Sequence, residues 1–242
     1  MRNLILFSLL FITLSSCDKP QKGYVIVKGE IKGMTDGTLL LQKVKNDQVV
    51  TVDSFQVIQD GKFEMKNRIK SPEIYYLRLK KFQLDYILFF AEEGVITIDT
   101  HLEKFASAAK VKGSKNHDLW TDYKKMISKF NDERLVLIRD NLMAEKDKNY
   151  TKIDSIDKVF KNHVKRRYLY TANYAVKHAD MEIAPYLALT ELYDANMYFL
   201  DTIEKSMNEK TRNSMYGEKF LEFLAKVKKS EVDTANTITS EK

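Results

Sequence analysis

The feature that most constrains this 242-residue chain is a change of pattern at Gly113. After Gly113 no proline occurs until Pro185 and no glycine until Gly217, and apolar residues recur at intervals of three and four. That spacing predicts amphipathic helices. Before Gly113, short apolar or alternating runs are separated by Gly, Asp and Asn, which is typical of antiparallel strands joined by tight turns. We therefore expect an α+β chain, with a β domain over residues 24–112 and a helical region over residues 113–228.

Eight runs in the first half have the length and composition of strands. The clearest is Gly61–Asn67, where Phe63 and Met65 alternate with charged residues and the preceding Asp60 with Gly61 predicts a tight turn. Two to seven residues join each run to the next, which is too few for parallel crossovers, so we expect an antiparallel sandwich or a jelly-roll-like module. The expected strands are Tyr24–Ile31, Thr38–Lys45, Val49–Val57, Gly61–Asn67, Glu73–Lys80, Tyr86–Ala91, Gly94–Thr100 and Ala108–Lys112.

The second half predicts an antiparallel helical bundle that packs against the β domain. A first helix begins after Ser114, an N-cap residue type. Its expected core stripe is Leu119, Tyr123, Ile127 and Phe130, continuing through Leu135, Ile138 and Leu142. The stripe of a second helix is Tyr150, Ile153, Ile156, Phe160, Val164 and Tyr168. Shorter helices are expected at Ile183–Tyr193, in an Asp201-capped segment with Ile203 and Met207, and at Ser214–Val227. Residues 229–242 lack periodicity and are expected to form a disordered tail.

The N-terminus predicts export and a lipid anchor. Arg2 precedes an eleven-residue apolar run, Leu4–Leu14, which is the layout of a signal peptide and is shorter than the roughly 20 residues of a membrane-spanning helix. The run ends in Leu14-Ser15-Ser16-Cys17, which resembles the lipobox of bacterial lipoproteins. The resemblance implies a signal peptide over residues 1–16, cleavage between Ser16 and Cys17, palmitate among the acyl chains on Cys17, and a polar tether over residues 17–23.

Such an anchor would hold the mature protein in the cell envelope. We expect the outer membrane and a periplasm-facing position, because Cys17 is not followed by the run of acids that accompanies surface export. The alternative for Cys17 is an unmodified thiol after an ordinary signal peptide. It is the chain's one cysteine, which excludes an internal disulfide or a CxxC pair. The net charge of +6 could favour nucleic-acid binding, but the sequence contains no helix-turn-helix, zinc-finger or RNP-like pattern. We therefore expect no nucleic-acid partner.

Several motifs of the first half resemble one family. They are Val25–Gly29, Gly37–Leu41, Val52–Phe55 leading to Asp60–Phe63, and Ala91–Ile98. Together they look like the domain of unknown function 4369. That domain is typical of envelope lipoproteins of Bacteroidota, in which a β module and a helical segment precede a C-terminal thioredoxin-like domain. This chain stops at Lys242, so we expect it to lack that domain, and the thiol-disulfide activity of such relatives is carried over to no residue.

No pattern predicts a catalytic constellation, a cofactor or a metal site. The histidines are His101, His117, His163 and His178. None pairs with another at a spacing of three or four, so we expect solvated side chains rather than metal ligands. We expect Glu92 and Glu93 in a solvated hairpin turn, since neighbouring strand residues point to opposite faces. GxSxG, Walker and GxGxxG patterns are absent from the sequence.

Two groups of side chains in the helical half are candidates for binding. A basic cluster either faces solvent or meets a phosphate-bearing headgroup, and consists of Lys161, Lys165, Arg166 and Arg167 with His163. A set of tyrosines either belongs to the core or lines a groove for a partner, and consists of Tyr168, Tyr170, Tyr174, Tyr186, Tyr193 and Tyr198. Three short sequences resemble O-glycosylation acceptors, at 154–156, 201–203 and 233–235.

The hypothesis that these features favour is a non-catalytic, membrane-anchored envelope lipoprotein that binds another envelope protein. The alternative implied by the family resemblance is an accessory subunit of a thioredoxin-like redox or peroxide-handling system, with no thiol chemistry of its own. A third hypothesis is an enzyme that uses dispersed residues, which would need a concave pocket with convergent polar groups.

Overall fold

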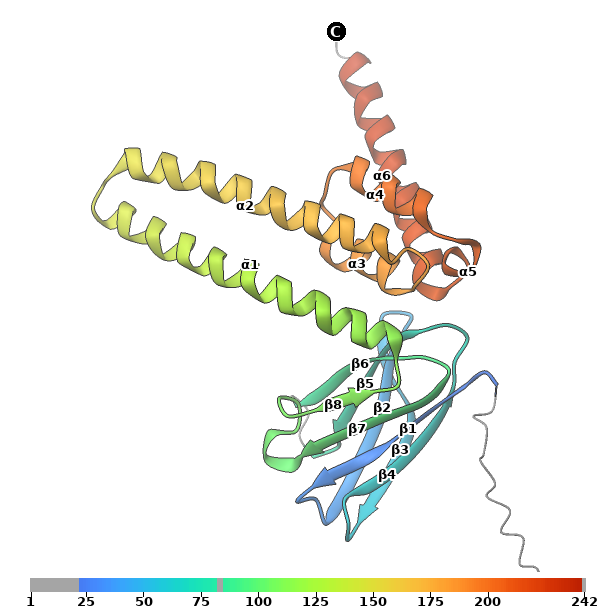
Figure 1. The fold of residues 1–242 in the computed structure, drawn as a ribbon. Helices are drawn as coiled ribbons and strands as arrows, with labels where there is room; N and C mark the ends of the chain where they lie inside the picture. The colour runs from blue at the N-terminus through green and yellow to red at the C-terminus, as the bar shows by residue number, and fades with distance from the viewer. Residues whose placement is uncertain (1–21, 82–84, 241–242) are drawn as a thin grey trace, which may run out of the picture.

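The computed structural model describes residues 22–81 and 85–240, with side chains described as far as Ser230. Within these residues a β-sandwich is followed by helices (Figure 1). The strands are β1 (Tyr24–Lys32), β2 (Asp36–Lys45), β3 (Gln48–Ile58), β4 (Lys62–Arg68), β5 (Glu73–Leu79), β6 (Tyr86–Ala91), β7 (Gly94–His101) and β8 (Lys110–Lys112). The helices are α1 (Lys115–Lys146), α2 (Tyr150–Lys177), α3 (Ile183–Glu191), α4 (Met197–Ser206), α5 (Glu209–Arg212) and α6 (Met215–Ser240), and a 3₁₀ turn covers Leu102–Lys104.

All eight expected strands are present, and the α+β fold class is confirmed. They form two four-stranded sheets, ordered β4-β1-β7-β8 and β3-β2-β5-β6. Alternate residues of both sheets point into a shared core, which includes Val27, Leu41, Tyr75, Phe89 and Ile96. The alternation that predicted the strands is thus the alternation between this core and the outer faces.

One pairing departs from the expected antiparallel arrangement. β1 pairs with β7 in parallel, with Val25 opposite Gly94 and Lys32 opposite His101. The short connections exclude parallel pairing only between strands that follow one another in the chain. β1 and β7 are separated by five other strands, so ample chain lies between them to bring them side by side in the same direction.

The helices begin at polar caps. The Ser114 side chain accepts a hydrogen bond from the backbone N–H of His117, as expected for the start of α1. Asn149 caps α2 in the same way. The expected cap at Asp201 is wrong, because Asn196 caps α4 and Asp201 lies inside the helix, where it pairs with Lys228 at 2.7 Å. α6 runs on to Ser240, past Lys229, where we expected regular structure to end. No glycine or proline follows Gly217 to interrupt it.

Aromatic side chains join the helices to the sandwich. The outer face of the β5–β6 sheet supplies Ile74 and Phe90, which pack in one cluster with residues of α1 and α3, namely Trp120, Tyr123, Ile127, Phe130, Ile183 and Leu187. The Phe90 ring meets Trp120 and Tyr186 edge-on, at centroid distances of 5.9 and 5.1 Å. The molecule therefore has three layers, with the second sheet covered on both faces.

A buried amide links the two halves at the first turn of α1. The Asn116 side-chain amide nitrogen donates to Glu92 Oε2 and to Glu182 Oε2, both at 3.0 Å. The Asn116 amide oxygen accepts from the backbone N–H of Ile183 at 2.8 Å. Asn116 and Glu182 are both buried. One side chain thus connects the loop after β6, the start of α1 and the start of α3.

The distal halves of α1 and α2 extend as a two-helix hairpin beyond the other helices (Figure 1). Leu135, Ile138 and Leu142, which we expected in the core stripe of α1, are exposed there. The stripe is buried only from Trp120 to Phe130, where the sheet and α3 cover it. Among the described residues, no helix combines the length and the apolar content that crossing a membrane requires.

Candidate functional site

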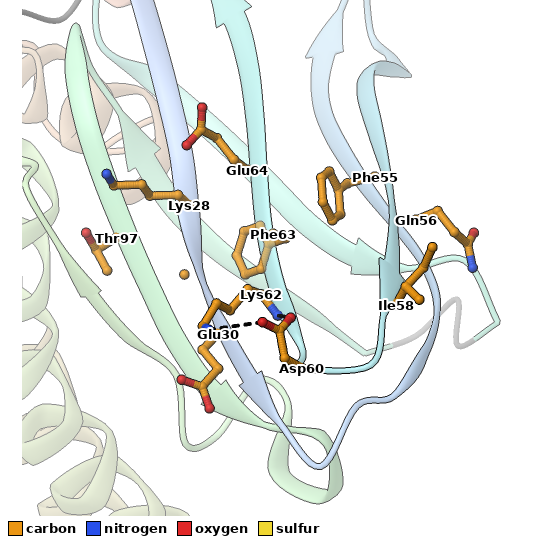
Figure 2. Close-up of a pocket in the computed structure, with 11 residues that line it drawn as sticks. Lys28, Glu30, Phe55, Gln56, Ile58, Asp60, Lys62, Phe63, Glu64 and Thr97 are labelled. Atoms are coloured by element: carbon orange, nitrogen blue, oxygen red, sulfur yellow. Dashed lines mark hydrogen bonds and ion pairs between the residues drawn. The ribbon is translucent and has the colours of Figure 1, made fainter. Parts of the chain in front are cut away.

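A groove with a mostly apolar floor lies at the edge of the sandwich, and we call it the sandwich groove. It has a volume of about 710 Å³ and opens between β3 and the β4–β1 edge of the other sheet (Figure 2). Its lining residues are Lys28, Gly29, Glu30, Phe55, Gln56, Ile58, Asp60, Lys62, Phe63, Glu64 and Thr97. A volume of this size falls within the range of small-ligand sites, roughly 300–1,000 Å³.

Two phenylalanines form the floor. Phe63 points inward from β4 and is buried, and Phe55 of β3 packs against the same core while staying partly open. Figure 2 shows both rings at the gap between the two strands, with Ile58 beside them on β3. Ile58 is largely exposed. An apolar side chain that enters the groove would therefore meet two rings and a branched aliphatic group.

The groove is closed at one end by a tight turn. Gly61 has φ +71°, and a Cβ there would lie 2.3 Å from the backbone oxygen of Ile31, so the turn requires glycine. The backbone N–H of Ile31 donates to Gly61 O at 2.9 Å. Asp60 accepts from the Lys62 backbone N–H at 3.1 Å and pairs with its ammonium at 3.0 Å. The hydrogen bond with Lys62 lowers the pKa of Asp60, and Asp60 raises that of Lys62.

A carboxylate of β3, two residues before Phe55, bridges the two sheets. The register of β2 with β3 shifts at Leu41/Gln42, which leaves Val52 as an extra residue in β3. Asp53 follows this bulge. Its Oδ2 accepts from the backbone N–H of Lys66 on β4 at 2.8 Å, and its Oδ1 accepts from Ser54 N at 2.7 Å. Asp53 therefore holds the β3 and β4 edges together.

Charges of both signs form the rim of the groove. Lys28 lies opposite Glu64 and Glu30 lies opposite Lys62 in the β1–β4 register. Opposite charges in such positions stabilise strand pairing by about 0.2–1 kcal/mol each. The rim therefore carries two positive groups, Lys28 and Lys62, and three negative ones, Glu30, Asp60 and Glu64, and these groups are suited to orienting a charged neighbour of a bound apolar group.

We expected all four histidines to be solvated, but two of them are buried. His117 and His163 are buried, because they lie on the inward faces of α1 and α2. His117 stands 5.9 Å from Trp120 between ring centroids, and burial, with a smaller effect of the Lys124 charge, lowers its pKa to about 4. His163 packs 5.6 Å from the Phe130 ring. Within the described part of the chain, no group of three or more His, Cys, Asp or Glu is placed to hold a metal ion.

Glu92 is also not part of a solvated turn. Its Oε1 accepts from the backbone N–H of Lys115, in the first turn of α1, and its Oε2 accepts from Asn116. Glu92 thus satisfies a free N–H at the positive end of the helix. Glu93 is exposed and takes no part in this arrangement. This agrees with the expectation that the side chains of Glu92 and Glu93 point in opposite directions.

The basic cluster is divided among several environments. His163 is buried, Arg166 lies 3.5 Å from Glu133, and Arg167 pairs with Glu191. Lys161 and Lys165 are exposed. The cluster therefore does not form one cationic surface.

The tyrosines divide in a similar way. Tyr170, Tyr174 and Tyr186 pack against the cluster between sheet and helices. Tyr168 donates to Asp194 at 2.7 Å, which raises its pKa to about 12. Tyr193 and Tyr198 are exposed. Ser16 and Cys17 lie outside the described residues, so the lipid anchor stays a prediction.

Comparison with protein families agrees with the motifs. Residues 25–120 match the model of a family described as a domain of unknown function, DUF4369. The sandwich is thus similar to this family of domains. The match covers 96 of the 242 residues and ends in the second turn of α1. No curated protein and no solved structure is similar enough to the chain to count as a match.

Within the stretch that matches DUF4369, the motif residues mostly have structural roles. Asp53 bridges the sheets, Gly61 makes the turn, and Glu92 caps α1. Phe55 and Phe63 stand beside these motif residues in the sequence and form the groove floor. The groove was not predicted from the sequence. One phenylalanine directly follows Val52-Asp53-Ser54 and the other directly follows Asp60-Gly61-Lys62, and this placement after two turn or bulge motifs was a usable signal.

Proposed function

We propose that the chain is a non-catalytic interaction module of the cell envelope, anchored by a lipid on Cys17, whose sandwich groove binds an apolar side chain of a partner polypeptide. The observation that carries this proposal is the groove floor of Phe55, Ile58 and Phe63 inside a rim that carries charges of both signs. A polypeptide supplies an apolar side chain together with neighbouring polar groups, which is the combination that the rim and floor accommodate.

The rim supports binding rather than catalysis. Its charged groups lie opposite one another across β1 and β4, and the Asp60–Lys62 contact favours the charged forms of both groups. A general acid or base that works near neutral pH needs a pKa close to that pH. Asp60 is shifted in the opposite direction, so the groove favours a partner surface over a reacting substrate.

Photocrosslinking in the native envelope tests the groove. A benzophenone amino acid at Ile58, which is exposed inside the groove, is expected to give a discrete adduct whose partner is identified by mass spectrometry. The matched control is the same amino acid at Val49, also exposed on β3 but outside the groove. Adducts that are absent at Ile58, or the same at both positions, would overturn the proposal. If the crosslinked partner is thioredoxin-like, the result would favour the alternative function, an accessory subunit of a redox system.

Palmitate labelling tests the anchor separately. Incorporation of label is expected in the natural chain and is expected to be absent from the Cys17→Ala variant. A label that persists on Cys17→Ala would refute the lipid assignment and leave the groove to be judged by its own experiment.

A further inference from the structure

The outward side of the distal half of α1 carries an apolar surface, which we call the hairpin face. It consists of Leu135, Val136, Ile138, Leu142 and Met143. Leu135 and Leu142 are 64% and 60% exposed, and Ile138 is 37% exposed. Ala144, on the side of α1 that faces α2, is only 1% exposed, so α2 covers the opposite side of the helix (Figure 1).

The spacing of the hairpin face is that of a helix-to-helix seam. Leu135, Ile138 and Leu142 follow one another at intervals of three and four, as the core positions of a coiled coil do. Between them lies a shallow hollow of about 440 Å³, which Arg139, Met143 and Lys146 also line. Large branched side chains around a hollow form the knobs and holes that a second helix with the same spacing would fill.

We propose that the hairpin face packs against the same face of a second copy of this chain, with the two α1 helices antiparallel about a twofold axis. The two hairpins would together make a four-helix arrangement. A twofold contact requires a surface that complements itself, and a short seam centred on Ile138 with a leucine on each side does so. A specific interface buries about 800 Å² per partner, so the charged side chains that flank the seam would have to contribute area along with the five apolar ones.

The charges that border the seam select the antiparallel direction. Asp132, Arg139 and Lys146 recur at seven-residue intervals, so they lie along one flank of the seam. In an antiparallel pair Asp132 of each copy comes beside Lys146 of the other, which gives two attractive pairs. In a parallel pair this flank of one helix would face the opposite flank of the other, so Asp132 and Lys146 of the two copies would not meet. Arg139 comes near the axis, where its own Asp140, 2.9 Å away, offsets its charge.

The same charges argue against a lipid surface as the occupant. On this segment the acidic Asp132, Glu133, Asp140 and Glu145 outnumber the basic Arg134, Arg139 and Lys146, so the segment has no net positive charge to attract an anionic membrane. The proposed dimer is independent of the sandwich groove, which lies on another part of the molecule (Figures 1 and 2).

Sedimentation equilibrium of the full chain in density-matched detergent tests the proposal. We expect twice the chain mass for the natural protein and a single chain mass for a Leu135→Ser, Leu142→Ser double variant. A matched control, Val44→Ser with Val49→Ser, changes two exposed apolar residues of the sandwich and is expected to keep the dimer. Circular dichroism confirms that each variant is folded. A monomeric natural protein, or a dimer that survives the double leucine variant, would overturn the proposal.

Charge exchange identifies a second copy as the occupant. Asp132→Lys alone and Lys146→Asp alone each convert two attractive pairs into repulsive ones and are expected to weaken the dimer about tenfold. The variant that carries both exchanges restores opposite charges and is expected to return to within about twofold of the natural dissociation constant. Single exchanges without effect, or a double exchange that is weaker than either single one, would contradict the antiparallel arrangement.

Discussion

The backbone N–H of Ile74 donates a hydrogen bond to the hydroxyl of Tyr216 at 3.1 Å. Ile74 lies in β5, one residue beyond the last β2–β5 pair, Lys43 with Tyr75, and Tyr216 lies in the first turn of α6. The Tyr216 ring also packs 5.1 Å from Tyr186, and burial raises the pKa of its hydroxyl. This bond therefore ties the last helix to the sheet near the end of β2.

Removing the hydroxyl with Tyr216→Phe is expected to lower the free energy of unfolding by about 1–3 kcal/mol, because Ile74 N–H loses its partner in a buried place. Urea unfolding measures the change. Tyr198→Phe removes a hydroxyl from an exposed tyrosine and is expected to leave stability within about 0.5 kcal/mol. Equal stabilities for Tyr216→Phe and the natural protein would mean that water satisfies Ile74 N–H.

The bridge between the sheets makes a second prediction. Asp53→Ala removes the acceptors for Lys66 N and Ser54 N, and is expected to lower the free energy of unfolding by about 1–3 kcal/mol, since hydrogen bonds to a charged group are the stronger ones. Native-state hydrogen exchange should show faster exchange of the Lys66 amide in particular. Asp157→Ala, on the exposed side of α2, is the matched control and is expected to leave that amide unchanged.

Local patterns predicted the elements well because each pattern records which face of its own segment is buried. Alternation placed all eight strands, and the cap at Ser114 placed the start of α1. The parallel pairing of β1 with β7 was beyond such patterns, since it depends on how distant segments meet. Periodicity also does not show whether an apolar face is covered, which is why Leu135 and Leu142 were expected in the core.

The candidate site depended still more on tertiary structure. Phe55 and Phe63 come together because a bulge at Val52 and a turn at Gly61 bring the edges of two sheets into contact. A phenylalanine in a predicted strand does not by itself indicate a groove. The burial of His117 and His163 likewise follows from the direction of a helix face toward its neighbours, which composition alone does not fix.

The amide that links the two halves makes a third prediction. Asn116→Ala leaves the buried Glu182 carboxylate without its donor and Ile183 N without its acceptor. We expect a loss of about 1–3 kcal/mol in the free energy of unfolding, because a buried acceptor and a buried donor lose their partner while Lys210, 3.7 Å from Glu182, still offsets the carboxylate charge. Asn131→Ala changes an exposed asparagine of the same helix and should be near neutral. A small loss for Asn116→Ala would show that solvent reaches Glu182.

The last prediction concerns pH. Burial lowers the pKa of His117 to about 4, whereas an unfolded histidine has a pKa near 6.5. Between these values the unfolded state binds a proton that the folded state does not, so the contribution of His117 to stability is complete above pH 6.5 and is lost as the pH falls toward 4. After allowance for its partial exposure, we expect the loss to be about 2 kcal/mol.

Urea unfolding of the natural protein, His117→Gln and His101→Gln between pH 7 and pH 4.5 checks this expectation. The difference in free energy of unfolding between the natural protein and His117→Gln should shrink as the pH falls, because the glutamine variant has no imidazole to protonate in the unfolded state. His101 is exposed on β7, so His101→Gln should keep the natural pH dependence. Parallel curves for the natural protein and His117→Gln would show that the imidazole is protonated as readily in the folded chain as in the unfolded one, which a side chain packed against Trp120 and near Lys124 should resist.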